Sequence, residues 1–200
     1  GAGVTWLRER AGVDTVVIIG NSGGGSLMGA YQSQATDPNI TATRGLSLPD
    51  AVCNLSPCDY YISLNAHPGR PEVLTAWMDP AVTDERDPLA VDSAIDMFNP
   101  DHGPPYSEAF IRRYRDAQTA RNHRITEWCN TELARLETHG AHDRAFGMYR
   151  VWADLRLLDG AIDPSDRPVG VCYAGDPKTA NYSPRGIGLT STCRSWLSMW

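Results

Sequence analysis

A β-branched apolar run that ends directly in a glycine-rich turn constrains this chain more than any other feature. Thr15–Ile19 reads TVVII, and the letters GNSGGG follow it at once. A continuous apolar run bounded by glycine is typical of a strand that is buried on both faces of a parallel sheet. Small residues with helical spacing follow over Ser26–Ala35. This order predicts a strand, a sharp turn and a tightly packed helix.

Two common ligand-binding turns between a strand and a helix do not fit these residues. A phosphate-binding P-loop requires a lysine, and no lysine occurs between Gly20 and Tyr31. A dinucleotide-binding turn requires G-x-G-x-x-G, but Met28 stands at the sixth position counted from Gly23. The turn is therefore not expected to hold a nucleotide.

The nucleophile elbow of serine hydrolases, G-x-S-x-G, fits Gly20–Gly24 at each fixed position. Such a turn forces the Ser22 backbone into a strained conformation that holds the hydroxyl clear of the sheet. Side chains two residues before and after the serine would collide, which accounts for Gly20 and Gly24. The alternative is a tight glycine turn whose serine only caps the helix.

The elbow prediction gives each residue of the turn a role. Ser22 is the candidate nucleophile, and the N–H of Gly23 is the candidate donor to an oxyanion. The turn itself is supported by Gly20, Asn21 and Gly24. The N-terminus of the following helix adds partial positive charge at the same place. A serine in this position is expected to attack a carbonyl carbon.

A second strand is expected over Asp59–Ala66, whose sequence is DYYISLNA. Strand, helix and strand in this order predict a right-handed parallel crossover. His67 follows the second strand at its carboxyl end, where parallel sheets place their sites. We expect His67 to line the pocket or to hold the hinge that follows, rather than to act as the general base for Ser22.

The residue pattern of the chain changes after His67, where prolines recur between short amphipathic segments. Ser107–Leu136 has an apolar stripe with helical spacing and predicts a long helix. Further helices are expected over Phe146–Leu158 and from Thr190 onward, with a loop over Ile162–Ile187.

Metal-ligating residues do not form a recognisable set. His139 and His142 have a suitable spacing, but no third ligand is evident. Four acidic residues match no calcium loop and are interpreted as helix caps and surface charge: Asp79, Asp84, Glu85 and Asp87. We predict neither a metal nor a cofactor.

Composition excludes several classes of protein. The net charge of -6 argues against non-specific nucleic-acid binding. No apolar run approaches the roughly 20 residues that cross a bilayer. The 5 cysteines are scattered without a C-x-x-C pair, which predicts reduced thiols and a cytoplasmic location. Homo-oligomerisation is left open.

The elbow resembles that of the α/β-hydrolase superfamily. The long run Leu64–Pro100 and the segments VWADLRLLD, DPSDRP and RSWLSMW are similar to a bacterial branch of this superfamily with poorly defined substrates. The resemblance implies an α/β fold with a mostly parallel sheet and a Ser-His-acid triad. It also implies a largely helical cap inserted after the sixth strand.

The resemblance divides the chain into three parts. Residues 1–66 would be part of the core, residues 67–188 the cap, and residues 189–200 a return towards the core. The family places the triad histidine and acid after later strands, and the second oxyanion donor on an earlier loop. These groups are therefore expected outside the 200 residues, as in a middle segment of a longer enzyme.

The function expected from the resemblance is hydrolysis of a small-molecule ester, thioester or related acyl substrate through an acyl-enzyme on Ser22. Acyl transfer, or hydrolysis of a carbon–carbon bond, would use the same serine. A non-catalytic binding protein of the same fold is the alternative from another class, and it is favoured if the chain is complete.

Overall fold

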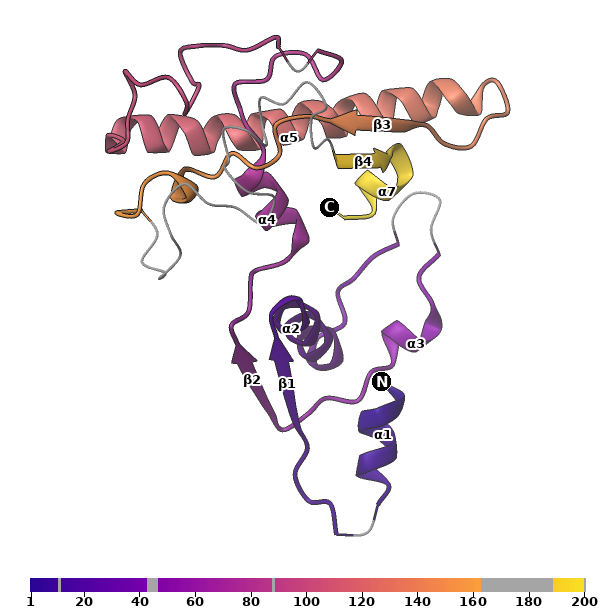
Figure 1. The fold of residues 1–200 in the computed structure, drawn as a ribbon. Helices are drawn as coiled ribbons and strands as arrows, with labels where there is room; N and C mark the ends of the chain where they lie inside the picture. The colour runs from indigo at the N-terminus through magenta and orange to yellow at the C-terminus, as the bar shows by residue number, and fades with distance from the viewer. Residues whose placement is uncertain (11, 43–46, 88, 163–188, 200) are drawn as a thin grey trace. The chain divides into compact units, whose positions relative to one another are not determined.

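The computed structural model describes residues 1–10, 12–42, 47–87, 89–162 and 189–199. These residues form a mixture of helices and strands with two small sheets (Figure 1). The chain divides into two compact units, unit 1 over Gly1–Val73 and unit 2 over Leu74–Trp200. Each unit has its own sheet and its own buried apolar residues, so each is described by itself.

Unit 1 is a strand–helix–strand crossover. Strands β1 (Val17–Asn21) and β2 (Tyr60–Leu64) pair in parallel, as the sequence predicts. Between them the chain forms α2 (Gly23–Thr36) and α3 (Asp50–Cys53), and α1 (Ala2–Arg8) precedes β1. Both strands lie within about two residues of the expected ranges, and α2 begins in the glycines of the turn.

Helix α2 covers one face of the sheet in unit 1. The hydroxyl of Tyr61 in β2 donates to the carbonyl oxygen of Gly25 at 2.6 Å and holds the helix against the strand. Near the other end of α2, the Gln32 side-chain amide donates to the Cys58 carbonyl oxygen and accepts from its N–H. Val4, Val16 and Cys58 form a small buried apolar cluster in the same unit.

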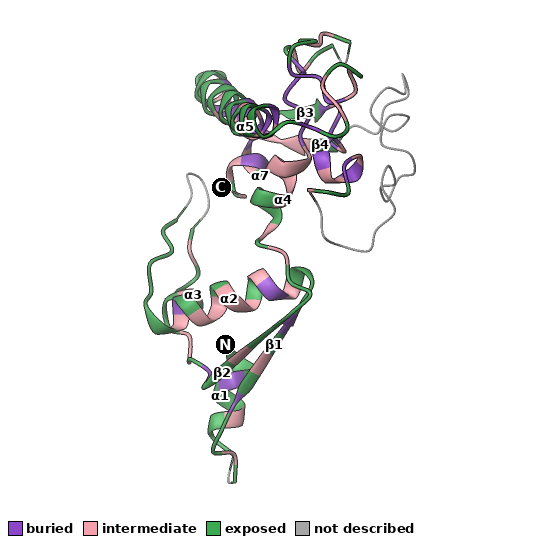
Figure 2. Ribbon diagram, turned by 90° about the vertical axis from the view of Figure 1, so that its left-hand side faces the viewer, coloured by how far each residue is buried: buried purple, intermediate pink, exposed green. Residues whose placement is uncertain are grey.

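The opposite face of the same sheet corrects the expectation of a strand buried on both sides. Five apolar side chains on this face are exposed within the described part of the chain: Val17, Ile19, Tyr60, Ile62 and Leu64. Most of β2 is accordingly coloured as exposed in Figure 2. Ile19, at the centre, is 61% exposed. The pattern of the run was read correctly as a parallel strand, but in unit 1 the covering elements pack on one face only.

Unit 2 is built along one long helix. Its elements, of which the first begins in unit 1, are α4 (Arg70–Trp77), α5 (Glu108–Glu137), β3 (Ala145–Met148), the 3-10 helix η1 (Leu155–Leu157), β4 (Leu189–Thr192) and α7 (Cys193–Leu197). Helix α5 confirms the helix predicted over Ser107–Leu136. Ser107 caps it by accepting the Phe110 N–H at 3.2 Å. Its two ends contribute to two buried apolar clusters.

The helix predicted over Phe146–Leu158 is wrong. The segment begins in β3, which pairs antiparallel with β4, and continues as extended chain into η1. Arg150 has a φ of 52°, which is incompatible with a right-handed helix. The apolar side chains of Val151, Ala153, Leu155 and Leu157 are buried, and so is Asp154 between them.

The end of the chain lies in unit 2. Residues 189–199, expected to return towards the core, form β4 and α7, which pack on β3 and α5. The predicted loop Ile162–Ile187 and the last part of the predicted cap lie almost entirely outside the described residues.

Candidate functional site

Ser22 joins β1 to α2 through a sharply bent backbone. Its φ of 55° and ψ of -124° lie in a region that residues with a side chain rarely adopt. Two hydrogen bonds fix the bend. The Ser22 N–H donates to the carbonyl oxygen of Leu64 at 3.1 Å, and its own carbonyl oxygen accepts the Gly25 N–H at 3.0 Å. The strain expected of a nucleophile elbow is therefore present.

The Ser22 hydroxyl is exposed and has no hydrogen-bond partner among the described residues. A capping serine would instead accept an N–H from the first turn of the helix. Ser26, one turn later, makes the ordinary local bond, donating to the carbonyl oxygen of Gly23 at 3.1 Å. The capping interpretation of Ser22 therefore does not fit its geometry, and its oxygen is free to meet a ligand.

Close packing around the turn requires glycine at two positions. A Cβ on Gly20 would lie 2.6 Å from the Gly24 carbonyl oxygen, as the elbow prediction anticipates. A Cβ on Gly25 would lie 2.1 Å from the Cβ of Ala66, because the first turn of α2 packs on the chain that leaves β2. The prediction for Gly24 needs correction, since a Cβ there would meet no atom within 4 Å. The collision falls one residue later.

The N–H of Gly23 lies in the first turn of α2, where helical N–H groups lack an intrahelical acceptor. It has no acceptor elsewhere in the described part of the chain. The 14 residues of α2 place the positive end of the helix dipole at the same point. An anion or a developing oxyanion next to Ser22 would be stabilised there.

The parallel register brings a histidine to the same edge of the sheet. Asn21 pairs with Leu64, so both strands end side by side and His67 follows the end of β2. A Cβ on Gly23 would lie 3.3 Å from the Nε2 atom of His67, so the imidazole lies against the Gly23 backbone. The expectation that His67 belongs to this site fits its position, and its ring is half-buried.

Asn65 is a feature of this edge that the sequence analysis did not single out. Its φ of 45° lies in the left-handed region, directly after β2 and beside Ser22. Asparagine tolerates this conformation better than most residues. Two residues with strained backbones, Ser22 after β1 and Asn65 after β2, therefore lie side by side at this edge of the sheet. An asparagine directly after a predicted strand was the sequence signal that could have indicated Asn65.

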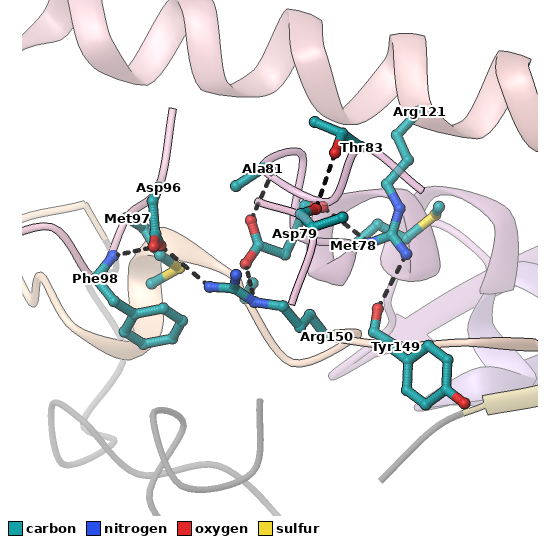
Figure 3. Close-up of polar contacts among 12 residues, drawn as sticks. Met78, Asp79, Ala81, Thr83, Asp96, Met97, Phe98, Arg121, Tyr149 and Arg150 are labelled. Atoms are coloured by element: carbon teal, nitrogen blue, oxygen red, sulfur yellow. Dashed lines mark hydrogen bonds and ion pairs between the residues drawn. The ribbon is translucent and has the colours of Figure 1, made fainter. Parts of the chain in front are cut away.

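Two of the four acidic residues interpreted as caps or surface charge, Asp79 and Glu85, have a different role, whereas Asp84 and Asp87 accept local backbone N–H groups near the surface. Asp79, interpreted from the sequence as a cap or surface charge, is fully buried in unit 2. Its Oδ1 accepts the Ala81 N–H at 2.9 Å, and its Oδ2 pairs with the Nε of Arg150 at 2.8 Å (Figure 3). On the other side, Arg150 reaches the Oδ1 of Asp96 at 3.2 Å. Burial raises the pKa of Asp79 to about 6, although Arg150 and the Ala81 N–H act to lower it.

A second buried arginine, Arg121 of α5, contacts the backbone next to this ion pair. Its side chain donates to the backbone oxygens of Asp79 and Tyr149, at 2.8 and 3.0 Å (Figure 3). It also makes a two-point contact with the Glu85 carboxylate, at 2.7 and 2.6 Å. Glu85 is thus a half-buried ion-pair partner of Arg121 rather than a helix cap or an unpaired surface charge.

The two histidines considered for a metal make ordinary hydrogen bonds to protein groups. The Nδ1 of His139 lies 3.0 Å from the carbonyl oxygen of Arg135, one turn earlier in α5. The carbonyl oxygen of His142 accepts from Arg194 at 2.7 Å. Within the described ranges no group of three or more His, Cys, Asp or Glu side chains is arranged to hold a metal ion.

Comparison with known proteins gives no relative. No family model, curated protein or solved structure matches the chain. The described helices include none with the length and apolar character needed to span a bilayer. Conclusions about activity must therefore come from the geometry around Ser22.

Proposed function

We propose that Ser22 is the nucleophile of a serine hydrolase that acts on ester, thioester or related acyl substrates. The observation that carries this proposal is the strained Ser22 backbone, with an exposed hydroxyl that has no partner among the described residues. Strain of 1–3 kcal/mol or so persists only where the surroundings enforce it, and it concentrates at functional sites. We further propose that unit 1 is the elbow region of an α/β-hydrolase fold and that its largely helical cap follows.

The chemistry has two steps. Ser22 Oγ forms a bond to the acyl carbon while the bond from that carbon to the alcohol or thiol breaks, and the serine proton passes through a general base to the leaving group. Water then attacks the acyl-enzyme, releases the carboxylic acid and restores the hydroxyl. The Gly23 N–H and the N-terminus of α2 stabilise the oxyanion in both steps.

Turnover of simple acyl compounds tests the proposal. We expect the full chain to hydrolyse p-nitrophenyl butyrate or a butyryl thioester, and Ser22→Ala to lower kcat by at least about 10³-fold, because the covalent route is lost. Ser33→Ala is the matched control, since Ser33 is an exposed serine further along α2. Turnover that survives Ser22→Ala would overturn the assignment of the nucleophile. Trapping of the acyl group by an added alcohol would favour acyl transfer.

A further inference from the structure

The imidazole of His67 occupies the space where a side chain on Gly23 would stand. A Cβ built on Gly23 would lie 3.3 Å from Nε2 and 3.8 Å from Cε1 of this ring. These are the two ring atoms farthest from the backbone of His67. The ring therefore presents its Nε2 end to the residue that follows the proposed nucleophile.

A hydrogen bond at the other ring nitrogen fixes which nitrogen carries the proton. The backbone N–H of Gly69 donates to Nδ1 of His67 at 3.2 Å. An N–H can only donate, so Nδ1 accepts and has no proton of its own. In the neutral ring the proton is then on Nε2, which becomes a hydrogen-bond donor. A ring in this tautomer cannot take the proton of Ser22 through Nε2.

Two donors thus lie close to each other. A Cβ stands about 2.5 Å from the nitrogen of its own residue, so Nε2 of His67 and the Gly23 nitrogen are less than about 6 Å apart. One oxygen at about 2.9 Å from each nitrogen can accept from both. Within the described residues the Gly23 N–H has no acceptor that would compete for it.

We propose that the Nε2–H of His67 is a second donor, beside the Gly23 N–H, to the carbonyl oxygen of the acyl group that Ser22 attacks. This inference rests on the function proposed above. It gives His67 a catalytic role that differs from the general base, and it places both oxyanion donors in unit 1. A Cβ at position 23 would press on the ring, which would have to shift by a few tenths of an ångström.

Two substitutions of His67 separate a donor from a base. His67→Ala removes the donor, and we expect kcat for p-nitrophenyl butyrate to fall by about 10²- to 10³-fold with little change in KM. His67→Gln retains an N–H donor at nearly the same reach, and kcat should stay within about tenfold of the parent. His123→Ala, at an exposed position on α5, is the matched control and should leave both constants unchanged.

Other outcomes would overturn the inference. Equal losses in His67→Ala and His67→Gln would assign the ring to proton transfer or to packing alone. Unchanged kcat in both variants would remove His67 from the reaction.

A measurement on the parent chain does not depend on how the variants fold. Nitrogen-15 NMR of the His67 ring should show the proton on Nε2 at a pH where the ring is neutral. A proton on Nδ1 would contradict the inference while leaving the role of Ser22 intact. Failure of Ser22→Ala to lower turnover would instead remove the proposed function, so the two failures are distinguishable.

Discussion

The two units place their polar chemistry in opposite environments. In unit 1 the Ser22 hydroxyl and the Gly23 N–H are exposed and make no hydrogen bond within the described residues. In unit 2 the charged side chains of Asp79, Arg121 and Arg150 are buried. Arg150 pairs with the Asp79 carboxylate, and Arg121 donates to the Asp79 backbone oxygen. Polar groups that a strained backbone leaves without a protein partner can bind a ligand, whereas the charges of buried ion pairs already have partners within the fold.

The largest effect that this comparison predicts is the loss of a buried partner in unit 2. Arg150→Met leaves the Asp79 carboxyl buried without its cation, which costs about 3–5 kcal/mol in similar cases. Methionine at position 150 would have the same positive φ and the same backbone strain as arginine. The change in stability therefore reports mainly the lost ion pair. Hydrogen exchange read by mass spectrometry should rise in unit 2 and stay unchanged in unit 1.

An exposed ion pair serves as the control for that substitution. Arg112→Met removes the contact between Arg112 and Glu108 on the surface of α5 and should cost less than about 0.5 kcal/mol. Adding Asp79→Asn to Arg150→Met should recover part of the loss, because the amide oxygen still accepts the Ala81 N–H. Equal effects of Arg112→Met and Arg150→Met would contradict the contrast between the units.

In unit 1 the sharpest test compares two adjacent glycines. Gly25→Ala forces a Cβ to within 2.1 Å of Ala66 and should destabilise unit 1 by about 1–3 kcal/mol. Gly24→Ala meets open space in the same helix and should be neutral or stabilising by up to about 1 kcal/mol. Denaturant unfolding of both variants measures the difference. Similar stability of the two would show that α2 does not approach the end of β2 so closely.

The pH dependence of stability sharpens the contrast further. Because burial raises the pKa of Asp79 to about 6, the folded state holds this proton more tightly than the unfolded state. The contribution of Asp79 to the free energy of unfolding is then fully present below about pH 4 and lost as the pH rises through about 6, by up to about 1.4 kcal/mol per pH unit.

Carbon-13 NMR titration of the Asp79 carboxyl measures this pKa directly, and the midpoint should lie near 6. A midpoint below the ordinary value of 3.8 would mean that the ion pair with Arg150 outweighs burial. The difference in stability between the parent and Asp79→Asn across the same pH range isolates this carboxyl from the others.

Local patterns were enough to predict the elements around the candidate site. The apolar run before Gly20 gave β1, and the serine between glycines gave the strained turn at Ser22. The apolar stripe of α5 likewise predicted that helix, because helical spacing over 30 residues is a strong signal.

Features that depend on distant residues were not predictable in this way. The need for glycine falls on Gly25 rather than Gly24, since the obstacle is Ala66, which follows the end of β2. The local sequence around Asp79 indicates a surface charge, because its partner Arg150 is distant in sequence and is brought to it only by folding. The orientation of the His67 ring depends on the Gly69 N–H, a backbone contact that no residue pattern encodes.

Mass spectrometry of the full chain after treatment with a fluorophosphonate is the most direct test of the central claim that the bend at Ser22 presents a nucleophile. We predict one covalent adduct, located on the peptide that contains Ser22, which is absent from Ser22→Ala and retained in Ser33→Ala. An adduct on a different serine, or no adduct at all on the parent chain, would contradict the account.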